Sequence, residues 1–423
     1  MLKVSYIIDN KDEVIKALLK RNFDANKIIN DLEDYNLKRK DIQSKLENIL
    51  SKSNNLSKQI GELIKSGNNE EADKIKKKTT DFKDSSKQLN SDLNLIKDKI
   101  LNILYKIPNV PNHLVPHGKN EDDNEEIYNS GELPEIKISL LSHWDLAKKY
   151  DIIDFDLGNK ITGSGFPVYK GMGAKLQRSL VSFFLDINTD AGYKEVQVPY
   201  LVNEESGLGT GQLPDKEGQM YHIQNENLYL IPTAEVPATN IFRDVILNEN
   251  EFPKALTAFS PCFRREAGSY GSDVRGLNRL HQFDKVEILR VEHPERSYLA
   301  LDEMVEHVKS IIEKLNLPYR IVKLCGSDLG FTSSLTYDFE VYSVAQKKWL
   351  EVSSVSNFES YQSNRLKLRY RDSDGNIKMA HTLNGSALAL PRILATIIEN
   401  FQTENGIVIP EVLIPYTGFS IIN

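Results

Sequence analysis

Apolar side chains recur with a seven-residue period through residues 28–103, and the polar turn Ser66-Gly67-Asn68-Asn69 interrupts them. A heptad repeat is typical of long helices that pack side by side. The pattern therefore predicts an antiparallel helical hairpin at about residues 27–105, in which each helix of about 37 residues would be ~55 Å long. The seam residues are Ile28, Tyr35, Ile42, Ile49, Leu56 and Leu63 before the turn and Ala72, Thr79, Ser86, Leu93 and Ile100 after it.

The pattern leaves two interpretations of this hairpin open. One is a dimerising coiled coil. The other is an arm that contacts a large flexible ligand, because Arg39, Ser53, Thr79 and Ser86 place polar groups in the seam. Residues 25–105 carry 16 Lys and Arg against 13 Asp and Glu, whereas the whole chain has a formal charge of −7. Lys-rich helix faces are commonly just solvated, so this charge does not decide between the two interpretations.

Alternating polar and apolar residues predict two antiparallel strands in the middle of the chain. The loop between them contains Gly268, Gly271 and Gly276, with Arg275 and Arg279 around its far end, which predicts a mobile, basic loop. One face of the first strand would carry Ala258, Ser260, Cys262 and Arg264, and one face of the second Leu280, Gln282, Asp284 and Val286.

The first of these strands ends in a cation and an acid two positions apart, Arg264 and Glu266. This spacing predicts that both head groups lie on one face of the sheet. Such a pair can clamp a phosphate and orient an amine together. A surface ion pair is the common alternative for an arbitrary R-x-E, because exposed pairs are frequent and contribute little.

The rest of the chain mixes helical and strand patterns, which indicates an α+β fold. Residues 207–214 are rich in glycine, and we interpret them as a flexible lid. A strand at 379–386 followed by a helix at 387–401 would place Asn384 and Ser386 at a helix N-terminus, a natural site for polar ligands. Further helices are predicted at 174–187 and 294–316, and strands at 195–199, 228–231, 338–344 and 348–354.

Composition narrows the class of protein. At 423 residues and 40% hydrophobic content, the chain is long enough for two or three domains with real cores. No apolar run approaches the ~20 residues of a membrane helix, and acids near the start argue against a targeting peptide. Cys262 and Cys325 are too few for a disulfide framework or a Cys-rich zinc site. We expect a cytoplasmic protein without zinc and without a membrane partner.

Common nucleotide-binding motifs are missing from the sequence. There is no G-x-x-x-x-G-K-[ST], which argues against a P-loop NTPase, and Gly171-Met172-Gly173 lacks the third glycine and the strand-turn-helix context of a dinucleotide fingerprint. The H-I-G-H and K-M-S-K-S strings of class I aminoacyl-tRNA synthetases are absent too. Any ATP chemistry must therefore use another kind of site.

Several strings together resemble one family. F-R-R-E-A-G, R-G-L and H-Q-F-D-K-V-E, which begin at residues 263, 275 and 281, resemble motif 2 of the class II aminoacyl-tRNA synthetases, in the wording of the seryl-tRNA synthetase family. P-T-A-E-V-P at 232–237 is similar to that family's amino-acid pocket. The segment 174–199, which ends in Pro199, resembles motif 1, and residues 379–392 resemble motif 3.

One residue departs from the family pattern in motif 3. Pro391 precedes Arg392 where the family usually has glycine. The predicted helix at 387–401 would place Pro391 inside it, and a proline there would kink the helix and make Arg392 a less secure phosphate ligand than Arg264.

The resemblance implies the fold and the partners. We expect an α+β catalytic domain with a class II antiparallel sheet at 136–423, a linker at 107–135, and an N-terminal domain at 1–106 whose hairpin arm grips tRNA(Ser). The segment like motif 1 implies a homodimer. The implied reaction is activation of L-serine by ATP to seryl-adenylate, followed by transfer to tRNA(Ser). Whether tRNA(Sec) is also charged stays open.

The resemblance also implies site residues. Catalytic contacts would come from Arg264, Glu266 and Arg392. The serine pocket would be lined by Thr233, Ala234, Glu235, Arg264, Glu287, Asn384 and Ser386, with Glu287 facing the amine or the hydroxyl. ATP would contact Arg264, Arg265, Glu266, Leu280, Phe283, Glu351, Val352, Ser353, Ser354 and Arg392.

Mg²⁺ is the implied cofactor, with Glu351 and Ser354 as ligands, because a carboxylate and a hydroxyl supply the hard oxygens that Mg²⁺ prefers. His281 is expected to be structural, since a substrate carboxylate is the attacking group and no protein base is required. Two alternatives remain: an amino-acid-activating enzyme that loads a carrier protein, and an inactive homologue with a binding role. The long hairpin disfavours the first, and the presence of Arg264, Glu266 and Glu351 disfavours the second.

Overall fold

The computed structural model describes residues 1–131, 133, 139–266 and 275–423. The chain divides into two compact units, one made of residues 2–19 and 23–108 and the other of residues 1, 20–22 and 109–423. Gly268 and Gly271 of the predicted basic loop lie outside the described residues. Within the described part, no helix is both long and apolar enough to cross a membrane.

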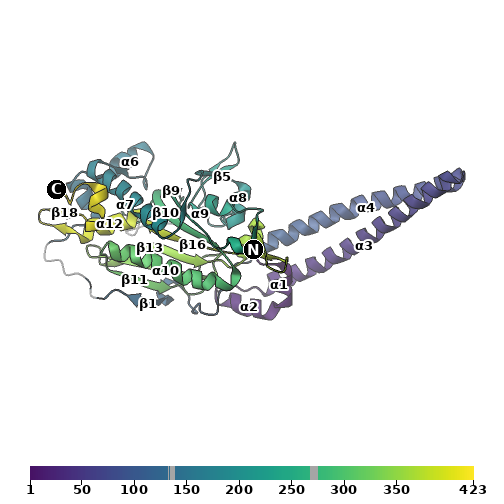
Figure 1. Ribbon diagram of the computed structural model, residues 1–423, viewed down its shortest axis with the longest axis horizontal. Helices are drawn as coiled ribbons and strands as arrows, with labels where there is room; N and C mark the ends of the chain where they lie inside the picture. The colour runs from purple at the N-terminus through teal and green to yellow at the C-terminus, as the bar shows by residue number, and fades with distance from the viewer. Residues whose placement is uncertain (132, 134–138, 267–274) are drawn as a thin grey trace. The chain divides into compact units, whose positions relative to one another are not determined.

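The helical unit contains the predicted hairpin. Helices α1 (Val4–Asp9) and α2 (Lys11–Leu19) precede α3 (Asn26–Lys65) and α4 (Asn69–Leu104), which run side by side in opposite directions (Figure 1). Gly67 turns the chain between α3 and α4 with a positive φ of 78°, a conformation that glycine adopts without strain. The heptad prediction is confirmed.

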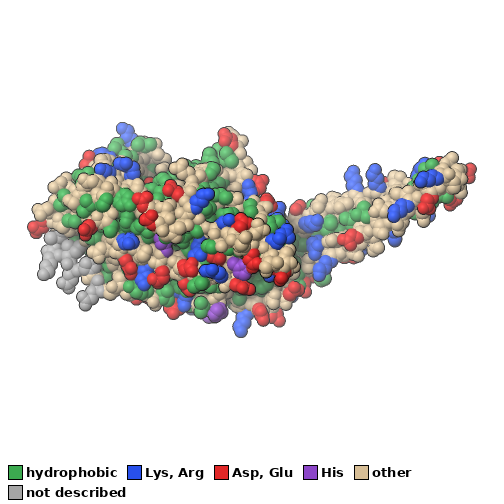
Figure 2. Space-filling model, viewed as in Figure 1, with side chains coloured by type: hydrophobic (Ala, Val, Ile, Leu, Met, Phe, Trp, Pro, Cys, Tyr) green, Lys and Arg blue, Asp and Glu red, His purple; other side chains and the backbone are tan. Residues whose placement is uncertain are grey.

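Packing along the hairpin is uneven. Ile29, Leu32 and Leu46 are buried between the start and the middle of α3, and Leu93 and Ile100 are buried in the last third of α4. Across residues 47–92, all of which are described, Ala72 is the only buried residue. Figure 2 shows basic and acidic side chains interspersed along this part of the chain. In the outer half of the hairpin the apolar seam residues, such as Leu56, Leu63, Ile75 and Phe82, are therefore only partly buried.

The larger unit is built on an eight-stranded sheet in which every neighbouring pair is antiparallel except β4 and β9. This arrangement confirms the predicted α+β class. The first half of the segment predicted as a linker, 107–135, leads into the sheet's edge strand. The spatial order is β1 (Glu125–Asn129), β11 (Tyr319–Lys323), β12 (Leu335–Ser343), β13 (Lys348–Asn357), β16 (His381–Ala389), β10 (Gln282–Glu292), β9 (Lys254–Phe263) and β4 (Lys194–Glu195).

Long helices cover the sheet and share one hydrophobic core with it. Helix α10 packs on β13 and β16, α12 on β10 and β12, and α7 on β9 and β10 (Figure 1). The helices of this unit are α5 (His143–Lys149), α6 (Phe155–Ile161), α7 (Gly171–Asp190), α8 (Glu204–Thr210), α9 (Glu235–Asn240), α10 (Ser297–Lys314), α11 (Tyr361–Leu366), α12 (Leu390–Asn400) and α13 (Ile414–Thr417).

Short strands make four small sheets around the main one. Among them, the sheet of β5, β7 and β6 leads the chain into α9, on the approach to the candidate site. The short strands are β2 (Ile153–Asp154), β3 (Val168–Tyr169), β5 (Leu201–Asn203), β6 (His222–Ile223), β7 (Leu228–Leu230), β8 (Ile246–Asn248), β14 (Arg369–Arg371), β15 (Ile377–Met379), β17 (Gln402–Thr403), β18 (Gly406–Val408) and β19 (Ile421–Ile422).

Two predictions near the third motif are wrong. Strand β16 continues to Ala389, so Asn384 and Ser386 lie in the middle of a strand and not at a helix N-terminus. Helix α12 begins at Leu390, which makes Pro391 its second residue. In the first turn the proline removes no intrahelical hydrogen bond, so it does not kink the helix. The expected penalty on Arg392 is therefore absent.

The prediction of a flexible lid at 207–214 is wrong for residues 207–211. Residues up to Thr210 form α8, capped at its start by the Asn203 side chain and at its end by Gly211 with φ +94°. Gly207 and Gly209 are buried, and a Cβ atom on them would lie 2.7 Å from Leu213 and 2.6 Å from Leu366. These glycines permit close packing, which the sequence alone does not distinguish from flexibility.

The strand predicted at 195–199 is much shorter than expected. It consists of Lys194–Glu195, which pairs with β9, and one further hydrogen bond joins the Val196 N–H to the Thr257 carbonyl. The paired strands predicted at 338–344 and 348–354 are confirmed and are longer than predicted, as β12 and β13.

Candidate active site

Two adjoining cavities lie over the central strands β13, β16 and β10. The first has a volume of about 860 Å³ and the second about 600 Å³. Their linings overlap, so the two form one continuous site with a shared middle. The shared residues include Thr233, Arg264, Lys285, Glu351, Ser354 and Ser386.

Arg264 lies at this shared middle. Its backbone N–H donates to the His281 carbonyl at 2.9 Å, which continues the β9–β10 pairing by one step beyond Phe263. Its guanidinium lies 5.2 Å from the centre of the Phe283 ring, close enough for a cation–π contact. The side chain borders both cavities. Its Nε donates to the Pro232 carbonyl at 3.4 Å, and the other guanidinium donors make no hydrogen bond to the part of the chain that the structure describes.

Arg264 and Glu266 do not form the predicted pair on one face of a strand. Strand β9 ends at Phe263, and Glu266 has a positive φ of 49°, which breaks the alternation on which the prediction depended. The Glu266 carboxylate instead forms an ion pair with Arg279. Both residues still border the second cavity.

The first cavity contains a buried ion pair. The Glu287 carboxylate accepts a hydrogen bond from the Thr233 hydroxyl at 3.0 Å and lies 2.6 Å from the Lys285 ammonium. The Lys285 and Glu287 side chains are only 9% and 3% exposed. Sequence reasoning missed Lys285, although its position two residues before Glu287 on a strand is the signal that could have found it.

A second buried carboxylate, Glu235, lies beside this pair. Burial, and then the negative charge of Glu287, raises the pKa of Glu235 to about 7. The Gln362 amide donates to Glu235 at 2.6 Å and accepts from the Thr382 hydroxyl at 2.7 Å. Gln362 comes from α11, far along the chain, and no local pattern marks it as a site residue.

Strand β16 contributes the other predicted serine contacts. Ser386 lies opposite Glu287 of β10, and Asn384 lies opposite Ser356 of β13, so both residues line the first cavity. Ala234, also predicted, is fully buried and borders neither cavity.

The second cavity contains most of the predicted ATP contacts. Arg392 projects from the start of α12, donating from Nε to the Asn278 carbonyl at 3.1 Å and from Nη1 to the Glu351 carbonyl at 2.7 Å. Arg265 borders neither cavity. The remaining predicted residues that line the second cavity are Glu266, Leu280, Phe283, Glu351, Val352, Ser353 and Ser354.

Acidic side chains gather where a cation is expected. Glu351 is 49% exposed and neighbours Glu340 across β12 and β13, and the Ser354 hydroxyl donates to Asp338 at 2.5 Å. Burial, and then the charge of Glu351, raises the pKa of Asp338 well above its ordinary value. Glu351 is paired with Arg392 at 3.5 Å, and Glu340 is paired with Arg320. The half-exposed Glu351 carboxylate therefore keeps oxygens that could bind a hard cation. Across the described residues, no three His, Cys, Asp or Glu side chains converge on one metal position, so other oxygens would complete the shell.

The predicted structural role of His281 agrees with its contacts. Its ring stacks on Phe166 with 5.5 Å between centroids, and its Nδ1 lies 2.9 Å from the Tyr221 hydroxyl. Its backbone N–H donates to the Gly165 carbonyl at 2.9 Å. The residue therefore fixes the start of β10 against the turn at residues 163–166.

Comparison with known proteins gives consistent matches over the chain. Residues 1–111 match the model of the seryl-tRNA synthetase N-terminal domain, and residues 220–401 match the class II tRNA synthetase core domain of the G, H, P, S and T enzymes. The serine–tRNA ligase of Salinibacter ruber is 45% identical over 99% of both chains. That of Nautilia profundicola is 45% identical over 98% of this chain and 100% of its own.

A solved structure gives the same result. The seryl-tRNA synthetase of Pyrococcus horikoshii, crystallised with ATP, superposes with a TM-score of 0.92 at 31% identity, covering 100% of this chain and 99% of its own.

Proposed function

Since the chain belongs to the seryl-tRNA synthetase family of class II aminoacyl-tRNA synthetases, we propose that it is a serine–tRNA ligase that uses ATP. The observation that carries this proposal is the pair of adjoining cavities that meet at Arg264. One is lined by buried polar groups suited to a small amino acid. The other is lined by Phe283, Arg392 and Glu351, which suit a nucleotide triphosphate.

In the first step, a carboxylate oxygen of serine attacks the α-phosphorus of ATP. The bond between the α- and β-phosphates breaks, and pyrophosphate leaves with the bonding electron pair. Arg264 borders both cavities, so its guanidinium would hold the serine carboxylate and the α-phosphate together. Because the nucleophile belongs to the substrate, positioning and charge stabilisation account for the catalysis.

In the second step, a hydroxyl of the terminal adenosine of tRNA attacks the carbonyl carbon of seryl-adenylate. The seryl group moves to the tRNA, AMP leaves with the electron pair of the broken acyl–phosphate bond, and the proton of the attacking hydroxyl passes to the AMP phosphate or to solvent. The first cavity would keep the serine part of the adenylate in place throughout. Glu287, Thr233 and Ser386 would contact its hydroxyl or amine, and Glu235 would face the ammonium group.

On the nucleotide side, Phe283 would stack on adenine and Arg392 would contact the γ-phosphate. Glu351 and Ser354 would hold Mg²⁺, with Asp338 behind Ser354, and phosphate oxygens and water would complete the coordination. When bound, Mg²⁺ supplies positive charge that offsets the phosphate charges. The raised pKa of Asp338 supports a role for these residues beside a cation.

The hairpin α3–α4 is proposed to bind tRNA(Ser), with tRNA(Sec) as a further candidate. Apart from Ala72, every residue across 47–92 is exposed or partly buried, which suits a surface that contacts a large ligand. We also propose a homodimer whose interface includes the 174–199 segment, and a cytoplasmic location.

The role of the hairpin can be tested by deletion. Deleting residues 26–104 should preserve serine-dependent pyrophosphate exchange and abolish tRNA charging. Equal loss of both activities in a folded variant would contradict this division.

The primary test is ATP–pyrophosphate exchange with a panel of amino acids, followed by charging of unfractionated tRNA with labelled serine. Serine should support exchange far better than alanine, threonine or glycine. Exchange without tRNA charging would favour an enzyme that loads another carrier. No exchange with any amino acid would favour an inactive homologue.

A further inference from the structure

A fully buried carboxylate, Glu399, lies outside both cavities in the last turn of α12. A negative charge at this end of a helix is disfavoured by the helix dipole. Within the described part of the chain, no Lys or Arg forms an ion pair with it. Burial raises the pKa of Glu399, but its contacts with His143, and then the hydrogen bond from Ser343, outweigh burial and leave the pKa below its ordinary value. Donors from two distant segments, at residues 143 and 343–346, thus converge on this one carboxylate.

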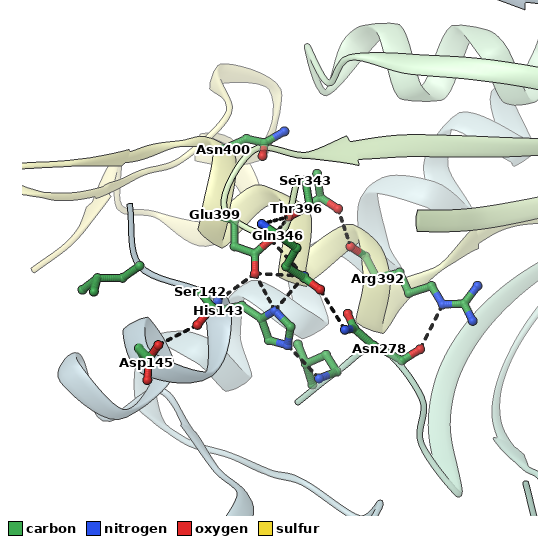
Figure 3. Close-up of polar contacts among 12 residues, drawn as sticks. Ser142, His143, Asp145, Asn278, Ser343, Gln346, Arg392, Thr396, Glu399 and Asn400 are labelled. Carbon is green, nitrogen blue, oxygen red and sulfur yellow. Dashed lines mark hydrogen bonds and ion pairs between the residues drawn. The ribbon is translucent and has the colours of Figure 1, made fainter. Parts of the chain in front are cut away.

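The first branch of hydrogen bonds from Glu399 runs through His143, at the start of α5. Its backbone N–H donates to Glu399 Oε1 at 2.8 Å, and its ring Nδ1 lies 2.7 Å from the same oxygen (Figure 3). On the other side of the ring, Nε2 accepts the backbone N–H of Leu277 at 2.8 Å. Because Nε2 accepts, the ring proton that faces Glu399 lies on Nδ1. The imidazole thus joins Glu399 to the chain that leads into β10.

Two further contacts, at Gly276 and Arg275, fix the backbone just before Leu277. Gly276 has a φ of +66°, and a Cβ atom there would lie 2.2 Å from His143 Nε2. The Arg275 guanidinium lies 4.6 Å from the centre of the Trp144 ring. The start of α5 therefore fixes residues 275–277, which border the site through Leu277.

The second branch from Glu399 runs through Gln346, in the turn between β12 and β13. Its amide nitrogen donates to both Glu399 oxygens at 3.0 and 3.1 Å, and its carbonyl oxygen accepts from the Asn278 side chain at 2.8 Å. The backbone carbonyl of Asn278 in turn accepts from Arg392 Nε (Figure 3). A continuous path of hydrogen bonds thus connects Glu399 to the guanidinium in the second cavity.

We propose that Glu399, His143 and Gln346 are positioning residues of the nucleotide site. They fix the backbone of residues 276–278, and through the Asn278 carbonyl they orient the Arg392 guanidinium toward the phosphates. Leu277 and Arg392, where the two branches from Glu399 end, border the second cavity, whereas none of the three positioning residues lines either cavity. The inference rests on the proposed function, because the proposed function assigns the second cavity to ATP.

The test replaces Gln346 with methionine, which keeps the side-chain length but removes the amide. In pyrophosphate exchange, the KM for ATP should rise roughly 3- to 10-fold, the equivalent of about one net hydrogen bond. The KM for serine should change less than about twofold. If the Gln346→Met protein does not fold, Gln346→Asn shortens the bridge while keeping the amide, and the same split is expected.

Asn400→Ala is the matched control. The Asn400 side chain joins α12 to the same strand connection, donating to the Tyr342 carbonyl at 2.8 Å and accepting from the Val344 N–H at 3.1 Å, without contacting Asn278 or Arg392. The Asn400→Ala variant should have a KM for ATP within about twofold of that of the unaltered protein. An equal rise in Asn400→Ala and Gln346→Met would show general loosening of α12 and overturn the inference.

A double-mutant cycle tests the path itself. Arg392→Lys removes the Nε–H that Asn278 accepts, so Gln346→Met should have little further effect on the KM for ATP in that background. Fully additive effects would overturn the proposed path while leaving the enzyme's activity in place. Absence of serine-dependent exchange in the unaltered protein would instead contradict the proposed function, so the two failures are distinguishable.

Discussion

The two cavities of the candidate site differ in how far their charged side chains are buried and paired. In the first cavity, the Lys285 and Glu287 side chains are 9% and 3% exposed and already paired with each other. In the second, Arg392 and Glu351 are 31% and 49% exposed and only 3.5 Å apart as an open ion pair. Buried, paired groups give a fixed shape that suits discrimination between small amino acids. Exposed charges can exchange partners when a phosphate and a cation arrive.

Arg264 should show the largest effect, because it borders both sides. Arg264→Lys keeps the charge but removes the planar fork that could contact a carboxylate and a phosphate at once. We expect kcat/KM for exchange to fall roughly 100-fold or more for serine and for ATP alike, as for a lost transition-state donor. Steady-state exchange with each substrate varied in turn measures this. A loss confined to one substrate would mean that Arg264 belongs to one side alone.

Glu287→Gln should have the next largest effect, and this effect should be confined to the activation of serine. The variant keeps the volume but leaves the Lys285 ammonium without its partner and weakens the bond from Thr233. Serine activation should fall by roughly 2 kcal/mol or more, with the KM for ATP little changed.

Alanine is the control substrate for Glu287. If the carboxylate reads the serine hydroxyl, exchange with alanine should suffer less than exchange with serine, because alanine has no hydroxyl to lose. Proportional losses on both amino acids would assign Glu287 to the shared amine. Threonine should remain the more troublesome competitor in both proteins, because packing alone must refuse its extra methyl group.

The ionisation of Glu235 should make the KM for serine depend on pH. With a pKa of about 7, raised by burial and by Glu287, the side chain is mostly neutral at pH 6 and mostly ionised at pH 8. The ionised form attracts the serine ammonium, so the KM for serine should fall roughly 5- to 10-fold as the pH rises across this range. Glu235→Gln cannot ionise and should give a flat, weak profile. A profile unchanged by that substitution would assign the titration elsewhere.

Glu351→Gln should have the smallest effect, because the carboxylate is half exposed and other oxygens can complete the shell of a cation. The Mg²⁺ concentration for half-maximal exchange should rise about 3- to 5-fold, with the KM for serine unchanged. Titration with Mg²⁺ at saturating ATP measures this. A larger change in the KM for serine than in the Mg²⁺ requirement would remove the distinction between the two sides.

The sequence by itself determined the features that depend on neighbours along the chain. A heptad period specifies α3 and α4, because residues seven apart return to the same side of a helix. Alternation specifies β9 and β10. The strings around Arg264 and Thr233 and at residues 379–392 identify the family, and that resemblance implies most of the site residues that line the two cavities.

Only the tertiary structure decided the contacts between distant segments. The Glu235–Gln362 bond joins residues 127 positions apart, and the His143–Glu399 bond joins residues 256 positions apart, so no local period marks either pair. Glycines in α8 serve close packing against Leu366, which composition cannot separate from flexibility. The start of α12 depends on how far β16 pairs with β10. Local patterns specify elements, whereas burial and pairing across the sheet decide where each element ends and which side chains it brings together.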